Sequence, residues 1–162
     1  MKKVWIVMTA ALASAVNAQE MVPHGASGPW AVLVNPANDN GCLMERKLDS
    51  GTLIQIGYTP ERNGAFFAAY NADWTTIEVG ATGQVLLDFG DSRFQGEVVG
   101  AAYNDLPGGY AFFNNPEFAS EFGRRFEVTI VGGSGVTEVV DLTGSKAALD
   151  AVRACQSEQN GQ

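Results

Sequence analysis

The chain has 162 residues, of which 18 are acidic and 10 are basic, and its formal net charge is −8. This charge repels nucleic acid and anionic lipid, so neither is an expected partner. Nine Phe and four Tyr are enough to build a packed core, which excludes a disordered chain.

The first eighteen residues have the pattern of a signal peptide. Residues 2–3 are lysines, residues 4–16 are apolar but too short to span a bilayer, and residues 16–18 resemble a cleavage site. We expect cleavage after Ala18, which leaves a periplasmic or secreted protein with no stable membrane insertion; an uncleaved N-terminal anchor is the alternative. Residues 19–28 contain Gly and Pro without periodicity and are expected to form a flexible lead.

Both cysteines, Cys42 and Cys155, lie in the part expected to be exported. Two cysteines in an oxidising compartment predict one disulfide, which here would close a loop of nearly the whole domain. Two free thiols that bind a metal are the alternative. That alternative lacks further ligands, because the chain has no second Cys pair and His24 is its only histidine, so we predict no metal site.

A single globular domain is expected over residues 29–157. Alternating or continuous apolar stretches bounded by turn residues predict short strands joined as antiparallel meanders. Residues 71–83 are expected to form a longer connection in which Trp74 and Ile77 make a short helical turn or a lid over the core. The predicted strands cover residues 30–34, 42–48, 52–58, 65–70, 84–89, 93–103, 110–113, 126–130 and 136–142.

Two short helices are predicted, at about 115–123 and 144–156. In the first, Phe118 and Phe122 are four residues apart and share one face. Thr143 or Ser145 is expected to cap the second, and residues 158–162 are expected to be a frayed tail. The fold class is therefore α+β and mostly β, with antiparallel meanders that form a sandwich or a curled sheet.

No catalytic or cofactor motif agrees with the spacing that its chemistry requires. Residues 88–90 match the magnesium-binding triplet of protein kinases, but the other kinase motifs are absent. Residues 38–41 resemble part of a calcium loop, yet Lys47 occupies the position of the bidentate Glu. Ser27 lacks the second glycine of a nucleophile elbow, because Pro29 stands there. We therefore predict no catalytic residue and no cofactor.

Paired carboxylates leave one enzymatic alternative open. A glycosidase needs only two such groups, and Asp88, Asp91 or Glu97 could supply them if they converge in one pocket. A small periplasmic hydrolase is the second hypothesis, although turn formation and solvation also account for these residues.

Adjacent aromatic residues are the strongest candidates for a binding surface. In each of two predicted strands a Phe-Phe pair must direct one ring to each face of the sheet. Either the two helices cover these rings, or one face exposes an aromatic patch for a protein, a peptide or a glycan. The candidate ligand-contact residues are Phe66, Phe67, Tyr70, Tyr110, Phe112 and Phe113.

A set of conspicuous residues is spread along the domain: Trp30 and Cys42 near its start, Trp74 at mid-chain, and a closing Leu142-Thr143-Gly144-Ser145 followed by a helix that ends in Cys155-Gln156. In these residues the chain resembles a group of small exported alphaproteobacterial proteins without an assigned activity. It is more distantly similar to invasion-associated locus B proteins in size, export and the late Gly-Ser helix. That likeness implies a non-enzymatic envelope role and carries over no site residues.

The leading hypothesis is a non-catalytic binding or interaction module of the bacterial cell envelope. It follows from the lack of a workable nucleophile, base or metal set. The partner would be an envelope protein, peptide or glycan. The alternatives are the hydrolase and a purely structural envelope protein.

Overall fold

A computed structural model describes residues 20–62, 64–115, 117–133 and 135–161, and the expected signal peptide lies outside these ranges. The described residues form one antiparallel sheet of ten strands in the order β1-β2-β3-β4-β5-β8-β7-β6-β9-β10. The strands are β1 (Val22–Ser27), β2 (Trp30–Asn35), β3 (Gly41–Lys47), β4 (Leu53–Tyr58), β5 (Ala65–Tyr70), β6 (Thr82–Asp88), β7 (Arg93–Tyr103), β8 (Leu106–Phe113), β9 (Glu127–Gly132) and β10 (Thr137–Asp141). The helices are η1, a short 3-10 helix (Pro36–Asn38), α1 (Glu117–Arg124) and α2 (Ser145–Asn160).

The centre of the sheet is the pairing of β5 with β8. These two strands carry the Phe-Phe pairs, and their register runs from Ala65 opposite Phe113 to Tyr70 opposite Gly108. Strands β1 to β5 form one meander, and β8, β7 and β6 form a second that returns in the opposite direction across the sheet. The prediction of a mostly β fold built from antiparallel meanders is confirmed.

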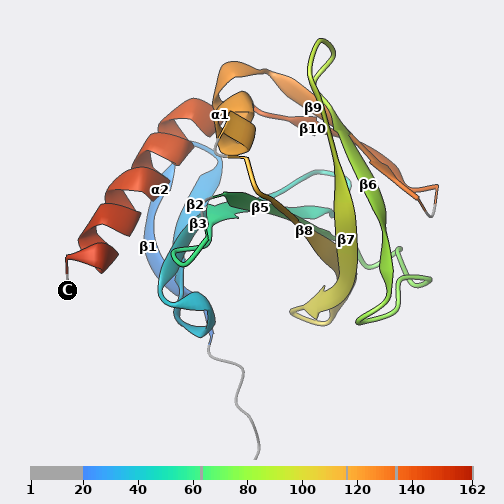
Figure 1. The fold of residues 1–162 in the computed structure, drawn as a ribbon, viewed down its shortest axis with the longest axis horizontal. Coiled ribbons are helices and arrows are strands. Elements are labelled where there is room, and N and C mark those ends of the chain that lie inside the picture. The colour runs from blue at the N-terminus through green and yellow to red at the C-terminus, as the bar shows by residue number, and fades with distance from the viewer. Residues whose placement is uncertain (1–19, 63, 116, 134, 162) are drawn as a thin grey trace, which may run out of the picture.

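The sheet curls, so that β10 approaches the turn between β3 and β4 (Figure 1). Side chains bridge this approach. Arg46 donates from Nη1 to the Asp141 carbonyl at 2.7 Å, while the hydroxyls of Ser50 and Thr52 donate to the Glu138 carboxylate at 2.8 and 3.0 Å. Among the described residues no backbone pairing joins β10 to this turn, so the sheet is curled without being a closed barrel.

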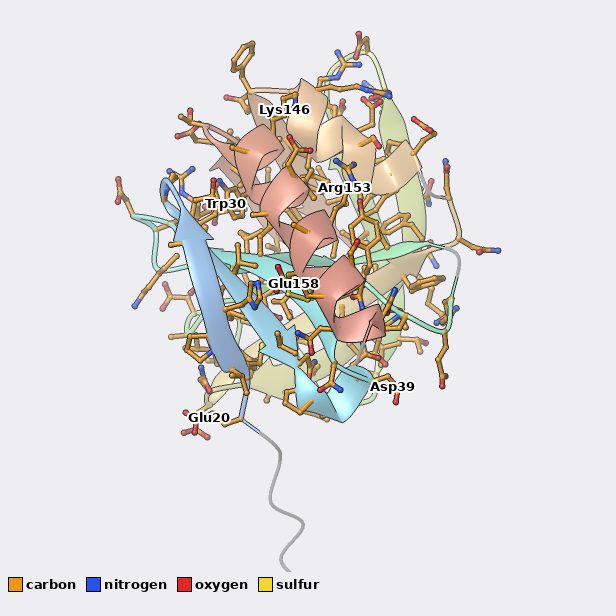
Figure 2. All side chains as sticks on the ribbon, turned by 90° about the vertical axis from the view of Figure 1, so that its left-hand side faces the viewer. Glu20, Trp30, Asp39, Lys146, Arg153 and Glu158 are labelled. Atoms are coloured by element: carbon orange, nitrogen blue, oxygen red, sulfur yellow. A yellow bond between two sulfur atoms is a disulfide. The ribbon has the colours of Figure 1, made fainter. Side chains whose placement is uncertain are left out.

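Both helices pack on the inner face of the curl and form the main core with it. Phe118 and Phe122 of α1 lie on aromatic rings of the sheet, and the closest pair, Phe113 and Phe118, has ring centroids 3.9 Å apart. Helix α2 lies against β1, β2 and β3, with Lys146 and Arg153 on its exposed side (Figure 2). None of the helices among the described residues is long and apolar enough to cross a membrane.

The chain ends differ from the sequence prediction. The expected flexible lead at 19–28 is wrong for most of its length, because β1 pairs with β2 from Val22 opposite Val34 to Ser27 opposite Trp30. Nearly every residue of this edge strand is exposed, so it carries no apolar alternation that would identify it. The frayed tail is also shorter than predicted, since α2 continues to Asn160.

The expected cap of the second helix is also wrong. The N-cap residue of α2 is Gly144, at a φ of 81° that favours glycine, and no side chain caps the helix. The buried Ser145 hydroxyl instead donates to the Phe122 carbonyl at the end of α1. Ser145 thus satisfies one of the unpaired carbonyls of the other helix.

Candidate binding site

A cavity of about 630 Å³ opens on the inner face of the curled sheet. Phe67 bounds one side of it, and the ring of Phe67 stacks on Phe122 of α1 at 5.9 Å between centroids. The exposed lining residues lie in the connection between β5 and β6, at the start of β6 and in the turn after β9, and they mark the mouth. The apolar and glycine residues of the lining are Phe67, Ala69, Trp74, Ile77, Ala81, Gly83, Val85, Val98, Gly100, Gly108, Gly109, Ala111, Ile130, Gly132, Gly133 and Val136.

The cavity exists because the inward side chains become smaller along the strands. Near α1, the Phe113 ring fills the space above Gly96 and lies 3.1 Å from the position of a Cβ there. Two residues further along β8 the inward residue is Ala111, and two beyond that it is Gly109, opposite Gly100 of β7. Aromatic packing on the inner face therefore ends at Phe113, and the smaller residues Ala111, Gly109 and Gly100 leave a hollow beyond it.

Residues 71–81 form a lid over this hollow. The buried Asn71 fixes its start, because its Nδ2 donates to Thr52 Oγ1 at 2.8 Å. At its other end, Gly80 donates to the Gly100 carbonyl and Gly100 donates to the Ala81 carbonyl, both at 2.8 Å. A Cβ on Gly100 would overlap the Glu78 carbonyl, so glycine is required where the lid crosses β7. Trp74 lines the cavity from the lid, which agrees with the lid alternative for this connection.

The interior of the cavity carries no charge. Strand register places Gly83 and Val85 of β6 on the inner face, and the alternate residues Thr82 and Gln84 on the outer face. Glu78, which is exposed at the mouth, is the single ionisable side chain among the described lining residues. The polar lining residues are Thr76, Glu78, Thr82 and Gln84, all of them exposed, so the deeper part of the site is suited to an apolar molecule.

The predicted ligand-contact aromatics are divided between the two faces of the sheet. Phe67 and Phe113 are buried in the core under α1, and of these two Phe67 also lines the cavity. On the other face Phe66 and Phe112 are half-buried, and Tyr110 is 44% exposed. The six residues thus form no continuous patch, because neighbours in a strand point in opposite directions.

Tyr70, the sixth of these aromatics, is buried in a small second cluster with Leu53 and Ala68, and its ring lies 5.5 Å from that of Tyr103. Burial, and then the neighbouring Tyr103, raise the pKa of Tyr70 to about 12. Its phenol therefore remains protonated at neutral pH and cannot act as a base.

The carboxylates of the hydrolase hypothesis do not meet in this cavity. Asp88 pairs with Arg93 at 3.0 Å, and Asp91 pairs with Arg125 at 2.8 Å. Glu97 lies opposite Gln84 on the outer face. Over the described part of the chain, no group of three or more His, Cys, Asp or Glu residues is placed to hold a metal ion.

A second hollow of about 530 Å³ lies beside the end of β6, where Arg124 and Arg125 line it. Both arginines already pair with acidic side chains, Arg124 with Glu117 and Arg125 with Asp91. The main cavity is therefore the better candidate site. Comparisons with protein-family models, curated proteins and solved structures find no match for this chain.

Most cavity-lining residues were not identified as site residues by the sequence analysis. The available signal was a set of small residues at inward positions of strands, among them Gly83, Gly100, Gly109 and Ala111. That signal acquires meaning only with the pairing of β7 and β8, which places Gly100 opposite Gly109.

Proposed function

We propose that this protein is a non-catalytic binding protein of the bacterial cell envelope whose ligand is a small apolar molecule held in the main cavity. The observation that carries the proposal is the cavity of about 630 Å³, lined by apolar side chains and glycine. Ligand sites commonly have about 300–1,000 Å³ and a mostly apolar lining. A small molecule fits this site better than the protein, peptide or glycan expected from the sequence.

Export is supported by two features. Residues 1–18 have the pattern of a signal peptide, and the disulfide Cys42–Cys155 is typical of proteins from oxidising compartments. The acidic composition gives such a protein no attraction to nucleic acid or anionic lipid.

The expected affinity follows from the area that a ligand can bury. A molecule that removes about 300 Å² of apolar surface from water gains about 7 kcal/mol before the cost of its immobilisation. Contacts with the rings of Phe67 and Trp74 add to this gain. After an immobilisation cost of at least about 4 kcal/mol, about 4–6 kcal/mol remains, so a dissociation constant between about 40 μM and about 1 mM is expected for a molecule that fills the cavity.

Fluorescence of the neutral dye N-phenyl-1-naphthylamine tests the proposal on the purified oxidised protein. We expect a saturable rise in emission with one dye per chain. Gly83→Leu should weaken dye binding about tenfold or more, because the new side chain extends into the cavity. A Cβ at Gly83 meets only Val98 Cγ1, at 3.6 Å, so the variant should fold normally.

Gly25→Leu is the matched control. It makes the same substitution in a strand, at a position with no neighbouring atom within 4 Å and away from the cavity. Dye binding to Gly25→Leu should equal that of the unmodified protein. Equal binding by Gly83→Leu, or no binding by the unmodified protein, would contradict the proposal.

A further inference from the structure

The walls of the main cavity offer no positive charge to a ligand. None of the eight basic side chains among the described residues lines the cavity. Most of them have acidic partners elsewhere, as in the pairs Arg46–Asp141, Arg93–Asp88, Arg124–Glu121, Arg125–Asp91, Lys146–Asp150 and Arg153–Asp150. An anionic group inside the cavity would therefore find no counter-charge.

Much of the backbone of these walls is also hydrogen-bonded. The walls are built by β5, β8, β7, β6 and β9, and each of these strands is hydrogen-bonded to a neighbour on both sides. At the mouth, Gly133 donates its N–H to the Gln84 carbonyl at 2.9 Å, and Gly100 donates to Ala81. The N–H groups of Gly133 and Gly100 are therefore not available to an anion at these two points.

The charge at the mouth acts in the same direction. Glu78 is exposed there, and the whole chain has a net charge of −8. Burying a carboxylate without a counter-charge or donors costs far more free energy than burying a hydroxyl. A carboxylate left at the mouth would meet a negative field instead.

We infer that the cavity selects electrically neutral lipophilic molecules and rejects their anionic counterparts, such as fatty-acid carboxylates. This inference rests on the small-molecule binding proposed above and adds the charge state of the ligand. Selection arises from the absence of cations among the described lining residues. The neutral donors there, such as the Trp74 indole and the Thr76 hydroxyl, can bond an alcohol but cannot balance the charge of a carboxylate. Hydrocarbon contacts with the apolar walls contribute equally to the binding of both classes.

Competition between two molecules of equal chain length tests the inference. Dodecanol and dodecanoate are titrated against bound N-phenyl-1-naphthylamine at pH 8, where the carboxyl is ionised. We expect dodecanol to displace the dye at a concentration about tenfold or more below that of dodecanoate. Equal potency, preference for dodecanoate, or displacement by neither overturns the inference while dye binding upholds the proposed function. Failure of the dye to bind overturns both.

A charge introduced at the mouth should change the selectivity. Gly83 lies in the lining with space around its Cβ position. Gly83→Lys should strengthen dodecanoate about tenfold relative to dodecanol, because the ammonium group supplies the missing partner. Gly83→Met adds a side chain of similar length without charge and should weaken both competitors. An unchanged ratio of the two potencies in Gly83→Lys also overturns the inference.

Discussion

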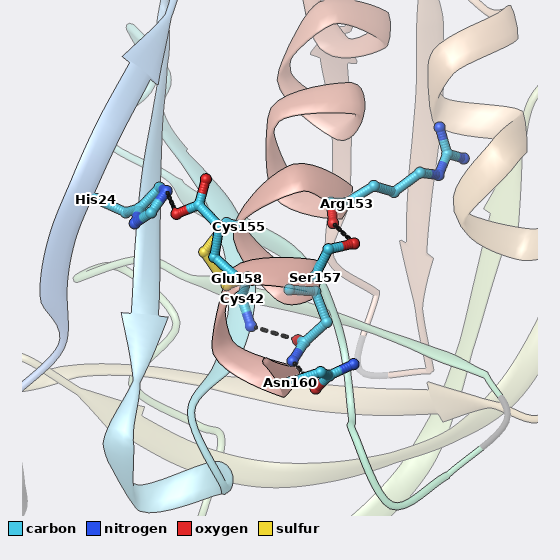
Figure 3. The surroundings of a disulfide bond; sticks show 8 residues. His24, Cys42, Arg153, Cys155, Ser157, Glu158 and Asn160 are labelled. Carbon is cyan, nitrogen blue, oxygen red and sulfur yellow. Dashed lines mark hydrogen bonds and ion pairs between the residues drawn. A yellow bond between two sulfur atoms is a disulfide. The ribbon is translucent and has the colours of Figure 1, made fainter. Parts of the chain in front are cut away.

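Cys42 and Cys155 join β3 to the C-terminal half of α2. Both are fully buried, and their Cα atoms lie 6.1 Å apart although 113 residues separate them in the chain. Figure 3 shows further contacts at the same place: the Cys42 N–H donates to Gln156 Oε1 at 2.9 Å, and His24 lies 3.3 Å from a Glu158 oxygen. The disulfide therefore fixes α2 to β3, and the two polar contacts add weaker links from the same end of α2 to β3 and β1.

Removal of the disulfide should lower stability strongly. Closing a loop of about 100 residues contributes about 4.7 kcal/mol in the chain-entropy model. We expect the double variant Cys42→Ala, Cys155→Ala to lose about 4 kcal/mol of unfolding free energy, measured by urea unfolding in oxidising buffer. In dithiothreitol the unmodified protein should approach the variant. An identical urea midpoint for both proteins in oxidising buffer would refute this role.

Individual residues were predictable from the sequence where a local or compositional rule applied. The disulfide followed from two cysteines and an expected oxidising compartment, and Phe118 and Phe122 followed from helical spacing. Ser145 was assigned the wrong role, because its partner is the Phe122 carbonyl, 23 residues away in the chain. A rule based on neighbouring residues cannot detect such a contact.

Helix α1 carries a buried carboxylate, Glu121, which the spacing of its apolar residues does not predict. Glu121 is only 8% exposed, and its carboxylate accepts hydrogen bonds from Arg125 at 3.1 Å and from Ser92 at 3.0 Å. Burial alone would raise the pKa of Glu121, but these hydrogen bonds, the Arg125 charge and Arg124 hold the pKa below its usual value. The network ties α1 to the turn between β6 and β7.

Glu121→Gln should therefore reduce stability in a pH-dependent manner. Since the folded pKa is lowered, the contribution of Glu121 is complete above the unfolded pKa of about 4.3 and is lost as pH falls through the folded value. We expect a loss of about 1.5 kcal/mol at pH 7, which shrinks towards pH 3 in urea unfolding series.

Glu117→Gln is the control for this prediction. It lies on the same helix and pairs with Arg124 at 3.2 Å, but its side chain is 64% exposed. The expected loss is therefore below about 0.5 kcal/mol at every pH, since exposed pairs contribute little. Equal losses for the two variants would show that burial does not strengthen the Glu121 network.

Strands were predictable where an alternating or continuous apolar stretch is bounded by turn residues, and two of them, β5 and β7, have the predicted bounds. Strand β1 was missed because an exposed edge strand shows no periodicity. Pairs of consecutive strands were predictable as meanders, but the pairing that joins the two meanders was not. The pairing of β5 with β8 crosses a long stretch of chain, and no pattern within one strand specifies its neighbour.

The candidate site depends on these pairings, so local sequence patterns do not identify it. Glycines at 83, 100 and 109 are visible in the sequence as turn or bulge signals. They become the wall of one cavity only when β5, β8, β7 and β6 lie side by side and the lid at 71–81 crosses them. The hollow is a property of the curled sheet, as is the approach of β10 to the turn between β3 and β4.

The contact between β10 and the turn between β3 and β4 is expected to be locally less stable than the centre of the sheet. Strand β10 pairs with β9 on one edge, whereas the hydrogen bonds at its other edge come from the side chains of Arg46, Ser50 and Thr52. Strands β5 and β8 have ladders on both sides. Amide hydrogens of β10 should therefore exchange with solvent faster than those of β5 and β8 in hydrogen-exchange measurements.

Glu138→Ala should lower the local stability of β10 further. The change leaves the buried Thr52 hydroxyl without its carboxylate acceptor, which costs about 1–2 kcal/mol of local stability. Exchange in β10 should accelerate while exchange in β5 stays unchanged, because the central ladder is intact. Glu127→Ala, at an exposed position of β9, should alter neither. Equal acceleration in β5 and β10 would mean that the curled sheet opens as one cooperative unit, and the side-chain bridge would then support the entire fold rather than its last strand.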